Sequence, residues 1–87
     1  MYDVMYTKQA VKELKKIDAP TRAIILGWIE KNLVGCEDPR AKGKGLTANK
    51  SGEWRYRVGD YRILANIEDD KVIILILTVG HRSKVYR

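Results

Sequence analysis

The run from Val72 to Val79 constrains the fold of this chain more than any other stretch. It reads VIILILTV and lies between Lys71 and Gly80, so every position in it is apolar or β-branched. A membrane-spanning helix needs about 20 such residues, and this run is far shorter. A short run rich in Ile and Val is typical of a central β-strand covered on both faces. We therefore expect this segment to lie inside a sheet.

A hairpin with alternating cations precedes this run. From Trp54 to Val58, apolar residues alternate with two arginines, a pattern typical of a half-buried strand whose arginines face outward. Gly59-Asp60 follows, and a two-residue loop that begins with glycine suits the primed turns of tight hairpins. We expect Tyr61 to Ile67 to form the return strand.

The turn predicts which residues face each other in this hairpin. Arg57 should lie opposite Arg62 and Arg55 opposite Leu64, so that a third arginine lies diagonal to a directly opposed pair. Like charges in this position destabilise a sheet by at least a few tenths of a kcal/mol. A bound polyanion would offset the repulsion, because one phosphate can accept hydrogen bonds from two guanidinium groups. The alternative is that the long side chains splay apart into solvent.

The upstream half predicts a strand and two helices. Tyr2 to Tyr6 alternates like a short strand, and Thr7 can cap the helix that follows it. Lys8 to Ile17 has apolar residues at helical spacing, and a second helix begins at Pro20 and ends before Gly35. At 87 residues the chain reads as one domain, 1–87. We predict an α+β fold: an N-terminal strand, an antiparallel two-helix hairpin, and a mainly antiparallel sheet with three further strands.

The charge balance favours a polyanionic partner. The 17 Lys and Arg residues exceed the 11 Asp and Glu residues, for a formal net charge of +6. A small basic domain of this kind is typical of nucleic-acid binding, although a basic surface also serves solubility. Between Glu37 and Gly52 we expect a loop with glycines between its lysines. Lys42, Lys44 and Lys50 can contact phosphate there, or belong to an ordinary mobile surface loop.

Other kinds of site have little to build on. Cys36 is the single cysteine, which excludes an internal disulfide and fits a reducing cytoplasm. One histidine and one cysteine, far apart in the sequence, do not form a metal-binding pattern. No charged-then-apolar leader opens the sequence. We therefore expect a cytoplasmic protein with no metal, no cofactor and no membrane partner.

The C-terminal residues extend the cationic set. If the apolar run pairs antiparallel with the hairpin, Gly80, His81 and Arg82 leave the sheet at the end that carries Arg57 and Arg62. Arginine binds phosphate, histidine can carry protons near neutral pH, and the tyrosine near the C-terminus can stack on an unpaired base. RNA also contains its own nucleophile, the 2′-hydroxyl, so positioning and charge stabilisation suffice to cleave it without a metal.

The order of elements and two segments resemble a known family. The segments WRYRVGDYRI and VGHRSKVY, with the strand and helices before them, are similar to the RelE/ParE superfamily of bacterial toxins along the whole chain. They resemble the RelE ribonuclease branch more than the ParE branch, which poisons DNA gyrase and generally lacks the cationic catalytic set.

The resemblance implies a ribosome-dependent mRNA interferase. Such a toxin enters the ribosomal A site near the 16S rRNA and cleaves the mRNA, leaving a 2′,3′-cyclic phosphate and a 5′-hydroxyl. A cognate antitoxin blocks it, and operator DNA is contacted only through the antitoxin. Two alternatives stay open: a gyrase-poisoning toxin without nuclease activity, and an inactive module that only binds an antitoxin peptide or RNA.

The resemblance also implies roles for single residues. Arg55 and Arg57 match two basic positions on the first strand of the hairpin, and Arg62 matches the arginine that stabilises the transition state. Arg82 matches the arginine after the last strand, and Tyr86 the C-terminal tyrosine. The predicted catalytic set is therefore Arg62, His81, Arg82 and Tyr86, and the predicted RNA-binding set is Arg55, Arg57, Lys42, Lys44 and Lys50.

Proton transfer is the point where this chain departs from the family pattern. Relatives can have lysines where this chain has Arg55 and Arg57, and an arginine does not release its proton at usable pH. We therefore assign proton transfer to His81. Glu53 is the alternative base, although it lies at the entrance of the strand.

Overall fold

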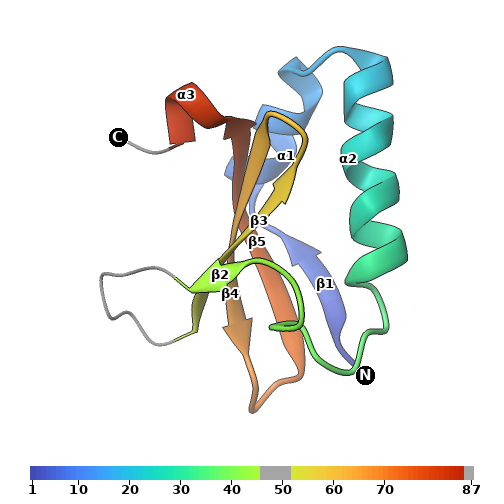
Figure 1. Cartoon of the computed structure of the whole chain (residues 1–87), viewed down its shortest axis with the longest axis vertical. Helices are drawn as coiled ribbons and strands as arrows, with labels where there is room; N and C mark the ends of the chain where they lie inside the picture. Colours follow the sequence, from blue (N-terminus) through green and yellow to red (C-terminus); the bar gives the residue numbers. More distant parts are fainter. Residues whose placement is uncertain (46–51, 86–87) are drawn as a thin grey trace.

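The computed structural model describes residues 1–45 and 52–85 (Figure 1). The predictions for Lys50 and Tyr86 lie outside the described residues. Five strands form one mixed sheet in the order β1-β5-β4-β3-β2. In chain order the elements are β1 (Asp3–Tyr6), α1 (Lys8–Lys16), α2 (Ala19–Asn32), β2 (Lys44–Gly45), β3 (Glu53–Val58), β4 (Tyr61–Glu68), β5 (Ile73–His81) and α3 (Arg82–Val85).

The predicted fold class is confirmed. An N-terminal strand and two helices precede the antiparallel strands β3, β4 and β5. The strand β1 is the exception to the antiparallel pattern, since it pairs parallel with β5, with Asp3 opposite Ile73 and Tyr6 opposite Ile76. A parallel pair requires a long crossover, and here the crossover contains the helices and the hairpin. The first and last strands therefore lie side by side.

The apolar run forms β5, which lies inside the sheet between β1 and β4, as predicted, but it is not covered equally on both faces. Ile74, Ile76 and Val79 are buried at 0–1% exposure in the core, whereas Leu75 and Leu77 on the other face are only half-buried. The core that contains the first set also contains residues of α1 and α2. The helices therefore cover one face of β5, and the prediction of cover on both faces was wrong.

The two helices begin at side-chain caps. The Thr7 hydroxyl accepts a hydrogen bond from the first turn of α1, as predicted, and Asp18 caps α2 through the backbone N–H of Thr21. Arg22 on α2 donates to the carbonyl oxygens of Leu14 and Ile17, at 3.3 and 2.9 Å. These bonds satisfy carbonyls at the end of α1 and join the two helices.

Part of the predicted loop between Glu37 and Gly52 forms a strand. This short strand, β2, pairs with the start of β3. The buried Tyr56 hydroxyl donates to the Pro39 carbonyl at 2.6 Å, and the Trp54 indole donates to the Lys42 carbonyl at 2.6 Å. Because side chains of β3 hold the backbone at Pro39 and Lys42, residues 39–45 lie against the sheet edge, and Lys42 and Lys44 lie there with them.

An ion pair joins Arg40, which precedes β2, to Asp69 in the turn between β4 and β5. Both Arg40 guanidinium nitrogens donate to the Asp69 carboxylate at 3.0 Å, and the Tyr2 hydroxyl donates to the same carboxylate at 2.7 Å. These contacts lower the pKa of Asp69 below its ordinary value, the Arg40 hydrogen bonds having the largest effect. The pair thus links residues far apart in the sequence.

Candidate functional site

The predicted register of the arginine hairpin is confirmed. Arg57 lies directly opposite Arg62, and Arg55 lies opposite Leu64. Gly59 begins the turn with φ +59°, a left-handed conformation that glycine adopts without a steric penalty. A two-residue loop fixes the pairing of both strands, so the opposition of the two arginines follows from the turn.

The arginines project from the face opposite the helices. Their neighbours Tyr56 and Ile63 are buried in the core, and successive side chains of a strand point to opposite faces. The Arg62 guanidinium donates from Nη1 to the carbonyl oxygens of Gly59 and Tyr61, at 2.9 and 3.1 Å. These bonds hold the guanidinium beside the turn, next to the exposed Arg57.

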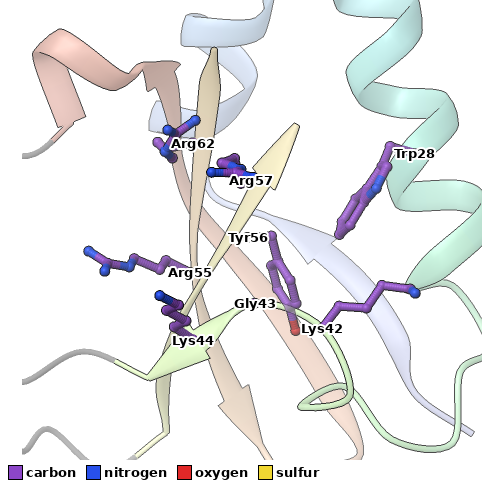
Figure 2. A pocket seen from close by; sticks show the side chains of 8 residues that line it. All are labelled: Trp28, Lys42, Gly43, Lys44, Arg55, Tyr56, Arg57 and Arg62. Atoms are coloured by element: carbon purple, nitrogen blue, oxygen red, sulfur yellow. The ribbon is translucent and has the colours of Figure 1, made fainter. Parts of the chain in front are cut away.

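A pocket of about 560 Å³ lies at the edge of β3 beside these arginines. Figure 2 shows its lining, in which Trp28 on α2 lies across from the arginine-bearing strands. Every charged residue that lines it is a cation, so the pocket favours an anionic ligand. The lining residues are Trp28, Lys42, Gly43, Lys44, Arg55, Tyr56, Arg57 and Arg62.

Five predicted RNA-binding or catalytic residues therefore meet in one pocket. Lys42 and Lys44 reach it from the segment around β2, and the three arginines reach it from the hairpin. Glu53 does not line it. This residue pairs with Asn66 at the end of the hairpin farthest from the turn, so the structure separates it from the opposed arginines.

Gly43 allows the β2 segment to approach β3. It has φ +81°, and a Cβ atom at this position would overlap the Arg55 carbonyl oxygen and lie 2.8 Å from the Trp54 indole nitrogen. We expect Gly43→Ala to lower the free energy of unfolding by about 1–3 kcal/mol more than Gly35→Ala, because overpacking adds to the backbone strain. Gly35 is the matched control, since it has φ +74° and no described atom beyond its own and adjacent residues lies within 4 Å of its Cβ position. Urea unfolding of both variants measures the difference, and equal losses would contradict the overlap.

His81 does not join the arginine pocket. The sequence predicted that it leaves the sheet, but β5 continues through it, so His81 pairs with Tyr61 while Gly80 pairs with Arg62. The His81 and Tyr61 rings meet edge to face, with centroids 5.6 Å apart, and Tyr61 packs against the core. His81 and Arg62 therefore lie at the same end of the sheet but on opposite faces.

A second pocket, on the helix side of the sheet, is lined by His81. Glu13, Lys16 and Asp18 line it together with His81 and Lys84. The His81 Nδ1 atom accepts a hydrogen bond from the Ser83 backbone N–H at 3.2 Å and lies 2.9 Å from the Ser83 hydroxyl oxygen. The expected convergence of histidine and arginines on one pocket is thus not found.

Arg82 begins α3, a short helix that the sequence did not predict. Its backbone N–H donates to the Asp60 carbonyl at 2.8 Å, which places α3 beside the hairpin turn (Figure 1). The Arg82 side chain is exposed and does not line the arginine pocket. The predicted partner that would complete this end, Tyr86, lies outside the described residues.

Glu13 is a residue that the sequence did not single out. Its Oε1 atom accepts hydrogen bonds from the Thr78 hydroxyl at 2.5 Å and the Val79 backbone N–H at 2.9 Å. These bonds lie next to a register shift between β4 and β5. In the sequence pattern of α1, Glu13 looks like one more solvent-facing charge. Only the tertiary structure shows that its side chain joins α1 to β5.

Within residues 1–45 and 52–85, no group of three or more His, Cys, Asp or Glu side chains is placed to hold a metal ion. Among the helices that the structure describes, none has the length and apolar character needed to cross a membrane.

Comparison with known proteins identifies the family. The family model described as "ParE toxin of type II toxin-antitoxin system, parDE" matches residues 4–86. Toxin RelG of Mycobacterium tuberculosis is 31% identical over 86 residues, which cover 99% of this chain and 97% of RelG. The chain belongs to the RelE/ParE family of type II toxins. Both the family and the fold implied by the sequence resemblance are therefore confirmed.

Solved structures of this toxin family share the fold. The M. tuberculosis toxin–antitoxin complex RelBE2 contains a chain that is 31% identical, with a TM-score of 0.82 over 93% of this chain and 98% of that one. The isolated RelE toxin of E. coli is 24% identical, with a TM-score of 0.77 over 99% of this chain and 92% of that one. At that identity the E. coli match supports the fold alone.

Proposed function

We propose that this toxin is a ribosome-dependent endoribonuclease that cleaves mRNA in the ribosomal A site. The observation that carries the proposal is the direct opposition of Arg57 and Arg62 in the hairpin of β3 and β4, beside a pocket whose charged lining residues, among those described, are all cations. Two opposed arginines weaken a sheet unless an anion lies between them. An RNA phosphate is the anion that the fold family and the basic composition favour.

The proposed chemistry needs charge stabilisation more than a protein nucleophile. The RNA 2′-hydroxyl attacks the adjacent phosphate, the bond to the 5′-oxygen breaks, and a 2′,3′-cyclic phosphate and a 5′-hydroxyl result. Negative charge develops on the phosphate oxygens, where Arg62 and Arg57 donate charge-assisted hydrogen bonds. Arg55, Lys42 and Lys44 hold the neighbouring phosphates in register.

The mechanism also requires a group that transfers protons. Arginine cannot accept the 2′-hydroxyl proton, so another group must do so. His81 stays our prediction, and it requires the RNA to pass around the end of β5, because His81 and Arg62 face opposite sides of the sheet. Charge stabilisation by Arg82 and base stacking by Tyr86 also stay predictions.

We further propose a cognate antitoxin as the regulatory partner. The M. tuberculosis RelBE2 and E. coli RelBE structures are toxin–antitoxin complexes. A chain with a net charge of +6 favours an acidic peptide as well as RNA, so one partner can exclude the other. Contact with operator DNA would occur only through the antitoxin, in the cytoplasm.

Mapping RNA ends on translating ribosomes tests the proposed activity. On induction of the toxin, we expect new 5′-hydroxyl ends in mRNA codons at the A site, and loss of these ends when translation initiation is blocked. The family model named for ParE makes gyrase the second candidate target. DNA breaks that depend on gyrase, with mRNA intact, would contradict the nuclease proposal. Expression without growth arrest would instead favour an inactive antitoxin-binding module.

A further inference from the structure

One end of the arginine pocket is built from an aromatic ring and a strand edge. Trp28 on α2 is half-buried and lines the pocket. The centroids of the Trp28 and Tyr56 rings are 5.6 Å apart, at an interplanar angle of 53°. Figure 2 shows Trp28 reaching from α2 toward the strand that carries Arg57. Packing on the buried Tyr56 supports the indole from one side and restricts its orientation.

The strand edge beside Trp28 has no neighbouring strand in the described part of the chain. β2 pairs only with Trp54 and Arg55, so β3 extends past it. Val58 and Tyr61 flank the two-residue turn, and the residues that flank such a turn exchange backbone hydrogen bonds. Because this pattern alternates along an antiparallel strand, the Arg57 N–H and C=O point away from β4, toward the pocket edge.

This combination suits one class of ligand. An unpaired nucleobase has a flat π-face that stacks on an aromatic side chain, and its edge carries neighbouring hydrogen-bond donors and acceptors. The Arg57 backbone offers one donor and one acceptor in line with such an edge. Cations beside them hold the phosphates that the base brings with it, the combination by which proteins bind single-stranded nucleic acid.

We infer that Trp28 and the backbone edge of Arg57 form a subsite for one unpaired base of the RNA. This inference rests on the proposed nuclease function and deepens it, since it assigns a specificity residue on α2, outside the cationic set. Trp28 stacks on the base, and the opposed arginines bind a neighbouring phosphate. The subsite thereby fixes which nucleotide of the strand lies next to Arg62.

A binding cycle between protein and RNA tests the subsite without relying on cleavage. The probe is a short single-stranded 2′-O-methyl RNA, which cannot react, together with versions that carry an abasic nucleotide at one position at a time. Affinity is measured for the wild type, Trp28→Leu, Trp28→Phe and Ile24→Ala. Ile24 lies on the same helix and is 65% exposed, so it serves as the control.

We expect one abasic position to weaken wild-type binding by about tenfold. Trp28→Leu should weaken binding of the intact RNA by a similar factor, and the abasic nucleotide should then cause no further loss. Trp28→Phe should lose less than Trp28→Leu and should retain part of the abasic effect. Ile24→Ala should behave like the wild type. Should Trp28→Leu fail to fold, Trp28→Phe decides, because its abasic penalty must be smaller than that of the wild type.

The subsite would be contradicted if the affinity losses from Trp28→Leu and from the abasic nucleotide multiplied when the two changes were combined. An abasic penalty in Trp28→Phe equal to that of the wild type would also contradict it. Both results would leave Trp28 as a core residue and the open edge of β3 available to an extended peptide. The result of this binding experiment can be distinguished from the result of the cleavage test. A toxin that cleaves mRNA but shows no coupling removes the subsite alone, whereas coupling without cleavage removes the nuclease activity and retains the base site.

Discussion

Arg62→Ala is expected to reduce ribosome-dependent mRNA cleavage about 100- to 1,000-fold, the effect of removing one preorganised donor from a developing negative charge. Arg62 is the natural candidate because its guanidinium is held at the hairpin turn by two carbonyl oxygens and lies directly opposite Arg57. Primer extension on translating ribosomes, at equal toxin concentrations, measures the cleavage rate of each variant.

The stability of the same variant separates function from folding. Loss of Arg62 also removes a like-charge repulsion, so the free energy of unfolding should change by less than about 1 kcal/mol. Lys12→Ala removes an equal charge from the exposed face of α1 and should leave cleavage unchanged. Arg62→Lys keeps the charge but loses the planar guanidinium group, so its cleavage rate should lie between those of Arg62→Ala and Lys12→Ala. Equal cleavage by Arg62→Ala and Lys12→Ala would contradict the assigned role.

Tyr56→Ala is expected to lower the free energy of unfolding by about 3–5 kcal/mol, the usual loss for a buried aromatic residue. Tyr56 is 1% exposed, packs against Trp28 and donates to the Pro39 carbonyl. A domain of this size has only about 5–15 kcal/mol in total, so this variant should be close to unfolding. Urea denaturation followed by circular dichroism measures the loss.

Tyr56→Phe is the matched control for the hydroxyl alone. Burial raises the pKa of Tyr56, so the hydroxyl keeps its proton and acts as a donor to Pro39. Its removal leaves a buried carbonyl without this partner and should lower the free energy of unfolding by about 1–3 kcal/mol. A Tyr56→Ala variant no less stable than Tyr56→Phe would show that the ring contributes little, contrary to its place in the core.

The parts of the site that sequence reasoning predicted are those set by local geometry. A two-residue turn beginning with Gly59 fixes the pairing of its flanking strands, so the opposition of Arg57 and Arg62 follows from neighbouring residues alone. The apolar run could likewise be placed inside the sheet, where β5 lies between β1 and β4. Its start was misjudged because Val72 adopts φ +57°, outside the strand conformation, and β5 begins only at Ile73.

The parts that were missed depend on contacts between distant segments. Trp28 has the helical spacing of a core residue, and only the position of α2 beside the edge of β3 brings it to the pocket. The segment around Lys42 read as a loop because the hydrogen bonds that hold it come from Trp54 and Tyr56 on β3. His81 was placed with the arginines because the strand was expected to end before it.

The sequence by itself indicated the family, through the resemblance of two segments to known toxins. It also determined the two long helices, the four longer strands and the row of arginines, because periodicity and turn chemistry act over a few residues. Tertiary structure alone decided which face of the sheet His81 occupies and which residues line the pocket. A strand that continues by two residues carries His81 to the helix face, since successive side chains alternate. Because β2 pairs only with the start of β3, the rest of this strand edge faces Trp28 of α2, which lines the same pocket as the arginines of the hairpin.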